Sequence, residues 1–170
     1  MKIVEALKEM KHTLKKIDGK QEQIVKYSSM LSTERPYFNS EEDQKKEVKQ
    51  LIQGVQDLIT RYLELKRKVE LTNLKTKIQF EGVNYSISDL LVLKRKLGQE
   101  ILKTYSCLSD TSAMQRLRGA GVGIDGKTPQ VVRFYSEQEK NENIRFWQDL
   151  LYNVESRLEV VNATTDLNEE

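Results

Sequence analysis

The sequence is poor in the residues that build reactive centres. It contains one cysteine, Cys107, and one histidine, His12, among 170 residues. A lone cysteine excludes an intramolecular disulfide and any multi-cysteine metal site. A catalytic triad would have to use His12, which lies in a lysine-rich stretch without a nucleophile or an orienting acid nearby. The sequence therefore predicts no catalytic residue, no metal site and no cofactor, and we expect a protein that is not an enzyme.

Long apolar runs and an excess of one charge are also missing. No stretch approaches the roughly 18 apolar residues that cross a bilayer. The first residues carry Lys2 and Glu5, where a signal peptide would have its apolar centre. The net charge of +2 gives no general basis for binding nucleic acid. We expect no membrane and no nucleic acid as partners, and a cytoplasmic protein or one carried within a larger assembly.

What is abundant is the composition of long helices. Only two prolines and eight glycines occur, and charged residues make up 32% of the chain. Apolar residues recur at helical spacing over four stretches, which is typical of helices that pack along one stripe. The first stripe comprises Ile3, Leu7, Met10, Leu14, Ile17, Ile24 and Leu31. These stretches predict helices over about 2–33, 41–73, 88–108 and 137–163. Pro36 limits the first helix, and suitable N-caps for the others are Ser40, either Ser86 or Ser88, and Ser136.

Two segments break the helical period. Residues 76–86 alternate apolar and polar side chains around Glu81-Gly82, which predicts a small β-hairpin. Residues 109–135 lose all periodicity and predict a glycine-rich loop that ends in a short strand at Val131–Tyr135. The fold class is therefore all-α. We expect a four-helix bundle, or long antiparallel helical hairpins, with one or two small β-hairpins, in a single helical domain over residues 1–170.

The glycine-rich segment matches the P-loop pattern from Gly121 to Thr128. A phosphate-binding loop must follow a buried strand and open a helix whose amides hold the phosphates. Here the preceding residues make a poor strand, and Pro129 and a β-like run follow. We therefore interpret the match as a turn-rich excursion, and nucleotide binding through residues 121–128 stays an alternative.

The same segment is locally basic. Its four cationic candidates for an interaction loop are Arg116, Arg118, Lys127 and Arg133. Exposed loops carry recognition more often than the helices that hold them, so an acidic protein surface or a phosphate is the expected partner type. The alternative is an insertion without a role.

Short polar motifs stand where two of the helices end. They comprise Thr72, Asn73 and Thr76 at the end of the second helix and Asn162, Thr164 and Thr165 at the end of the fourth. Such side chains satisfy the amides and carbonyls that helix ends leave unpaired, so structural capping is favoured over a ligand site. If the two ends meet, the motifs form one polar cluster.

The order of these motifs resembles a known family. Thr72-Asn73-Leu74-Lys75-Thr76, Ser86-Ile87-Ser88-Asp89 and Asn162-Ala163-Thr164-Thr165-Asp166-Leu167 are similar to the motifs of septicolysin-like proteins, small helical bacterial proteins. The resemblance covers nearly the whole chain, but the insert around residues 111–130 departs from it. It implies a helical fold of unknown biochemical function, and the cytolysin label suggests pore formation.

Three functions follow for testing. The favoured one is a non-enzymatic, oligomeric structural or interaction protein, with a bacterial or phage assembly as one setting. Its basis is the length of the first two stripes, whose apolar surface exceeds what the shorter helices cover, so that a second copy is the simplest partner. The alternatives are a pore-forming protein and a nucleotide-binding protein.

Overall fold

The computed structural model describes residues 1–121, 123 and 126–168, and these form two compact units. The first unit contains Met1–Ile78 and the chain from Val160 onward, and the second contains Gln79–Glu159. The chain length alone predicted a single domain. The predicted helical class is confirmed, with one small two-stranded sheet in the described ranges. No helix there combines the length and the apolar character that crossing a bilayer requires.

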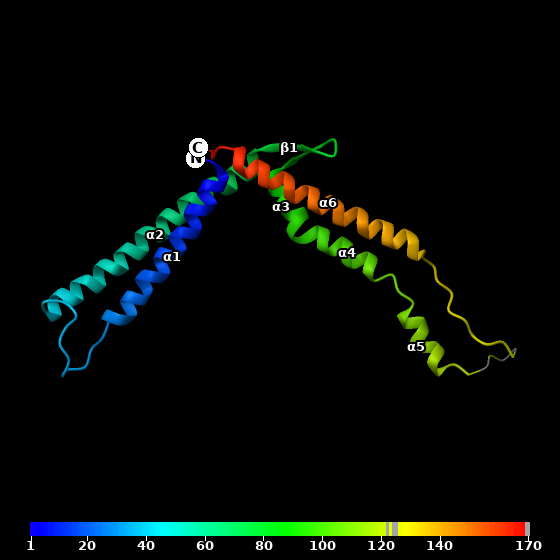
Figure 1. Ribbon diagram of the computed structural model, residues 1–170, viewed down its shortest axis with the longest axis horizontal. Coiled ribbons are helices and arrows are strands. Elements are labelled where there is room, and N and C mark those ends of the chain that lie inside the picture. The colour runs from blue at the N-terminus through cyan, green and yellow to red at the C-terminus, as the bar shows by residue number, and fades with distance from the viewer. Residues whose placement is uncertain (122, 124–125, 169–170) are drawn as a thin grey trace. The chain divides into compact units, whose positions relative to one another are not determined.

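The first unit is built on a helical hairpin. Helix α1 (Ile3–Tyr27) lies antiparallel beside α2 (Glu41–Lys75) (Figure 1). At 1.5 Å per residue they are about 37 and 52 Å long. The buried seam residues are spaced by three and four on α1, and by three, four or multiples of seven on α2. They comprise Ile3, Ala6, Met10, Thr13 and Ile17 of α1 with Gln44, Leu51, Leu65, Val69 and Thr72 of α2.

Helix α1 ends at Tyr27, several residues before the predicted end at 33. The buried Gln44 explains the early end. Its amide nitrogen donates to the Tyr27 carbonyl at 2.9 Å, and its oxygen accepts from the Tyr37 amide at 2.9 Å. The Tyr27 ring also packs against Tyr37 and Phe38, with ring centres 5.4 and 5.0 Å apart. These contacts draw the connection back onto the hairpin, and Leu31, predicted to lie in the stripe, is exposed instead.

The second unit pairs a broken helix with a long one. Helix α3 (Ile87–Val92), a π-helical turn η1 (Leu93–Leu97) and α4 (Gly98–Ser106) follow one another, and residues 137–159 of α6 (Glu137–Thr164) lie alongside (Figure 1). Lys94 of η1 forms an ion pair with Glu155 of α6. A continuous helix over 88–108 was predicted. The π turn inserts a residue, which rotates the following side chains by roughly 100° and leaves Leu97 exposed while Gly98 is buried.

The predicted β-hairpin is confirmed. Strand β1 (Lys77–Phe80) pairs with β2 (Val83–Ser86). Glu81 and Gly82 both have positive φ, 49° and 77°, as a two-residue turn between twisted strands requires. Ser86 then caps α3: its hydroxyl accepts from the Asp89 amide at 3.0 Å, and Asp89 accepts from the Ser86 amide at 2.8 Å.

The predicted loop over 109–135 is wrong in two places. Residues Thr111–Gly119 form helix α5, because Thr-Ser-Ala-Met-Gln-Arg-Leu-Arg consists mainly of good helix formers that precede the glycines. The strand expected at Val131–Tyr135 is not formed. In the described part of the chain these residues pair with no strand, and Phe134 is 97% exposed.

The tight contact between Gly98 and Leu151 in the second unit makes glycine-to-alanine changes at Gly98 and at Gly19 differ in the sign of their effect on stability. A Cβ at Gly98 would lie 2.3 Å from Leu151 Cδ2, whereas a Cβ at Gly19, in exposed α1, would meet nothing within 4 Å. Gly19→Ala should stabilise the protein by about 0.5–1 kcal/mol through helix propensity. Gly98→Ala should destabilise it by about 1–2 kcal/mol, because Leu151 must leave its position.

Urea unfolding followed by circular dichroism measures both changes. The Leu151→Ala change should remove much of the difference between the Gly98→Ala variant and its parent. Equal stabilisation by both glycine changes would contradict the close approach.

Candidate functional site

The predicted interaction segment is partly engaged in its own structure. Arg133 donates to Asp110 Oδ2 from Nε at 3.0 Å and also from Nη2, which lowers the pKa of Asp110 and raises that of Arg133. Arg116 on α5 donates to Ser112 at 3.3 Å. Arg118 and Lys127 are exposed. In the structure, Arg133 joins the two ends of the segment through its ion pair with Asp110. Its role in binding an acidic partner stays a prediction.

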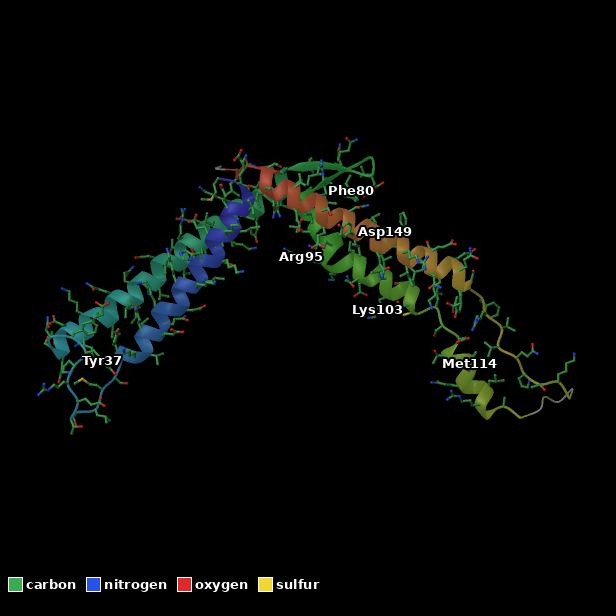
Figure 2. All side chains as sticks on the ribbon, in the orientation of Figure 1. Tyr37, Phe80, Arg95, Lys103, Met114 and Asp149 are labelled. Atoms are coloured by element: carbon green, nitrogen blue, oxygen red, sulfur yellow. The ribbon has the colours of Figure 1, made fainter. Side chains whose placement is uncertain are left out.

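A groove of about 300 Å³ runs beside α5. Ala113, Arg116 and Leu117 line one side, and Pro129–Val132 line the other. Figure 2 marks α5 by the Met114 side chain, which is 41% exposed. The groove is shallow and carries one cation, so its geometry favours no particular ligand.

The P-loop match does not have phosphate-binding geometry at its described positions. Residues 122, 124 and 125 lie outside the described residues. The Gly123 amide donates to the Lys127 carbonyl at 3.1 Å, and the Gly126 amide donates to the Gly123 carbonyl at 2.8 Å. No helix begins at residues 126–128. Amides that bond to their own loop are not directed at a phosphate, as P-loop amides must be.

The polar motif at the end of α2 forms a hydrogen bond with the C-terminal segment. Thr72 is 1% exposed, and its hydroxyl donates to the Lys68 carbonyl at 2.7 Å and accepts from the Asn168 amide at 2.8 Å. The Thr76 amide donates to the Thr72 carbonyl and ends the helix. One side-chain atom stands apart: Asn73 Oδ1 is buried without a hydrogen-bond partner among the described residues.

The polar motif at the end of α6 also forms hydrogen bonds with backbone groups. Thr164 donates to the Val160 carbonyl at 2.9 Å, and the Thr165 carbonyl accepts from the Ile3 amide at 3.0 Å. Asn162 is half-buried beside them. The two ends therefore meet through Thr72 and Asn168. The Thr72 and Thr164 hydroxyls bond to backbone groups, whereas the hydrogen bonds of Thr76 and Thr165 involve their main-chain groups, and structural capping by the whole motif stays a prediction.

The N-terminal residues complete this joint. The Leu167 amide donates to the Met1 carbonyl at 2.8 Å, and the backbones of Lys2 and Asp166 form an isolated antiparallel β-bridge. Lys2 Nζ lies 2.6 Å from Asp166 Oδ2, and this hydrogen bond lowers the pKa of the Asp166 carboxyl. Figure 1 marks both chain ends side by side at the start of α1. Residues far apart in sequence thus share one end of the hairpin.

The α1–α2 hairpin has two faces of different character. In heptad letters, the seam residues of each helix occupy positions a and d, and rows e and g flank them. One helix of an antiparallel pair is reversed, so row g lies beside row g and row e beside row e. Glu9 and Arg61, both in row g, confirm this register by an ion pair at 3.0 Å. Rows g and c form the polar face. It carries Lys2, Glu5, Glu9, His12, Lys16, Gln23 and Lys26 of α1 with Glu47, Gln50, Asp57, Arg61, Glu64 and Lys68 of α2.

Rows e and b form the opposite face, which we call the apolar face. It carries five large aliphatic side chains, Leu7 and Leu14 of α1 with Ile52, Ile59 and Leu63 of α2, together with the charged side chains of Lys11, Asp18, Lys45, Lys49, Lys66 and Glu70. The exposed fractions of the five aliphatic side chains are, in that order, 42, 47, 44, 46 and 48%. Because Glu9 lies level with Arg61, Leu7 lies level with Leu63 and Leu14 lies between Ile59 and Ile52. Five half-exposed aliphatic side chains therefore lie on the same face of both helices and at overlapping levels, and we call them the stripe.

Sequence reasoning placed part of this stripe in the core and missed the rest. Leu7 and Leu14 follow the three-and-four spacing, so they were predicted as seam residues. Only the partner register shows that Ala6 and Thr13 occupy the seam instead. The usable signal was the pair Ile52 and Ile59, which repeat every seven residues one position after the seam.

Other single candidates contribute little. His12 is exposed on the polar face, and Cys107 is exposed after α4. In the described ranges, no group of three or more His, Cys, Asp or Glu side chains is placed to hold a metal ion.

Comparisons with known proteins found no match to this chain. No protein-family model, no curated protein and no solved structure matches it.

The Thr72 contact predicts a selective loss of stability. Thr72→Val keeps the side-chain shape but leaves the buried Asn168 amide without an acceptor, which should cost about 1–3 kcal/mol. Thr60→Val is the matched control: Thr60 also donates to the carbonyl four residues before it, at 3.1 Å, but is exposed on the same helix. Chemical denaturation and hydrogen exchange at Asn168 measure the effect. Equal stability of the two variants would show that the joint does not depend on this hydroxyl.

Proposed function

We propose that this chain is a non-enzymatic helical building block that associates with its own copies through the apolar face. The observation that carries the proposal is the contrast between the two faces of one hairpin. The polar face bears charged and amide side chains along its length, and the apolar face bears the five half-exposed aliphatic side chains. Monomeric proteins rarely expose an apolar stripe that runs over two helices, and such stripes are typical of interaction sites.

The proposal also accounts for the four-helix bundle that the sequence predicted. Two hairpins that meet through their apolar faces form four helices around a shared core. Each hairpin supplies two helices, and the stripes of both become interior positions. The bundle is then a property of the pair of copies, with the existing α1–α2 seam retained in each.

The size of the stripe fits association. Burying a Leu or Ile side chain fully contributes about 1.5–3 kcal/mol, so covering the exposed half of ten such side chains contributes on the order of 10 kcal/mol. Association costs on the order of 4–15 kcal/mol in lost freedom of motion. Because gain and cost are similar, removing two apolar side chains per copy should be enough to separate the copies.

Light scattering and sedimentation at micromolar concentration test the proposal. The wild-type chain should sediment as a dimer or larger assembly, and the Leu14→Glu, Ile59→Glu double variant should be a folded monomer. The matched control is the His12→Glu, Gln50→Glu double variant, which adds the same two charges to the same helices on the polar face and should remain associated.

Circular dichroism checks that each variant keeps its helices. A wild-type monomer would contradict the proposal, as would equal dissociation of both double variants.

A further inference from the structure

A second copy can meet the apolar face in two symmetric ways. Most self-associating proteins form twofold dimers in which the same patch is used by both subunits. If the twofold axis runs along the helices, α1 of one copy lies over α2 of the other and every residue keeps its level. If the axis crosses the helices at right angles, α1 lies over α1 and α2 over α2, with their ends exchanged. Helices that meet are antiparallel in both cases, so helix dipoles do not decide between them.

Level matching favours the axis along the helices. In that arrangement Leu7 lies opposite Leu63 of the other copy, because the two residues are level within one hairpin. Leu14 lies between Ile52 and Ile59 of the other copy for the same reason. The stripe of one copy therefore overlaps the stripe of the other copy along its full length. A crossing axis achieves similar overlap only at the middle of the stripe, between Lys11 and Leu14.

The charges around the stripe separate the two arrangements further. A crossing axis at the middle of the stripe brings Lys11 of the two copies within one helical turn of each other. The same axis places Lys49 opposite Lys66 of the other copy. Both contacts join like charges, which is unfavourable. The axis along the helices separates the two Lys11 side chains onto opposite edges of the bundle.

That axis also creates an opposite-charge contact. Asp18 on α1 and Lys49 on α2 lie in row b, on the edges that overlap. Their levels differ by three residues, which is about 4.5 Å along the axis and within reach of a lysine side chain. Symmetry repeats the contact, so that Asp18 and Lys49 of each copy are both used.

We infer that the partner of the apolar face is a second copy of this chain, related by a twofold axis parallel to the hairpin, with α1 packed antiparallel on α2 of the other copy. The inference rests on the proposed self-association and adds its geometry. The stripe spans the eleven residue steps from Ile52 to Leu63, so its overlapping surface is about 17 Å long and about 20 Å wide, from the rise per residue and helix diameter. This area, on the order of 340 Å² per copy, is less than half of the roughly 800 Å² that standard interfaces bury on each side, so the polar residues that flank the stripe must supply the rest of the interface.

Cysteine cross-linking of the full chain tests the axis. In a Cys107→Ser background, Leu7→Cys and Leu63→Cys are made in separate chains, one of which carries a longer tag. Co-expression and mild oxidation should give the mixed disulfide dimer, because each chain carries only one of the two cysteines and the two positions face each other across the proposed interface. Lys11→Cys is the control: it should not link to itself, although losing the lysine also removes the repulsion that opposes a crossing axis.

A charge exchange gives an independent measurement. Asp18→Lys should raise the dimer dissociation constant on the order of tenfold, since both symmetric contacts become repulsive. Adding Lys49→Asp to the same chain should restore most of the affinity. The matched control is Lys16→Glu on the polar face, which should leave the dissociation constant unchanged.

The outcomes distinguish the geometry from the association itself. Cross-linking of the Lys11→Cys chain to itself, without the mixed dimer, would overturn the axis and leave self-association standing. A dimer that forms neither cross-link would place the interface elsewhere and also overturn the inference. A monomer without cross-links, including one in which another part of the chain covers the stripe, would overturn both proposals.

Discussion

The antiparallel register between α1 and α2 is the constraint on which the rest of this account depends. Glu9 with Arg61 at one level, and Gln44 with the Tyr27 carbonyl near the far end, hold the helices in a single alignment. That alignment buries Ala6 and Thr13 and leaves their neighbours Leu7 and Leu14 half-exposed. A rotation of α1 by about 100° around its own axis would exchange these roles. The apolar face is thus a consequence of the seam, and its position can be changed only by changing the seam.

The joint at the other end of the hairpin has a different physical basis. Here short polar side chains and backbone groups replace aliphatic packing: Thr72 accepts from the Asn168 amide, and Lys2 pairs with Asp166. Because the Asp166 carboxyl has a lowered pKa in the folded chain, its contribution to stability is present above the ordinary pKa of an aspartate. That contribution is lost as the pH falls through the lowered value. The buried, unpartnered Asn73 Oδ1 shows that the described residues do not satisfy every polar group of this joint.

Local rules predicted much of this fold and little of its surface. The β-hairpin followed from alternation around Glu81-Gly82, and the cap at Ser86 followed from its spacing to Asp89. The π turn before Gly98 could not be predicted, because the close contact between Gly98 and Leu151 joins residues far apart in sequence and is visible only in the packed helices. Helix α5 was not predicted, because the glycines that follow it indicated a loop over the whole segment. The apolar face required the partner register, which is tertiary information.

An isotope-filtered nuclear Overhauser experiment tests the central claim most directly. Copies labelled with carbon-13 at methyl groups are mixed with unlabelled copies, so that only contacts between different chains are observed. The account predicts signals between the methyl groups of Leu14 and Ile59 of different copies, and between those of Leu7 and Leu63. Signals from the polar face around His12 and Gln50, or no signal between copies at concentrations where the chain is associated, would contradict it.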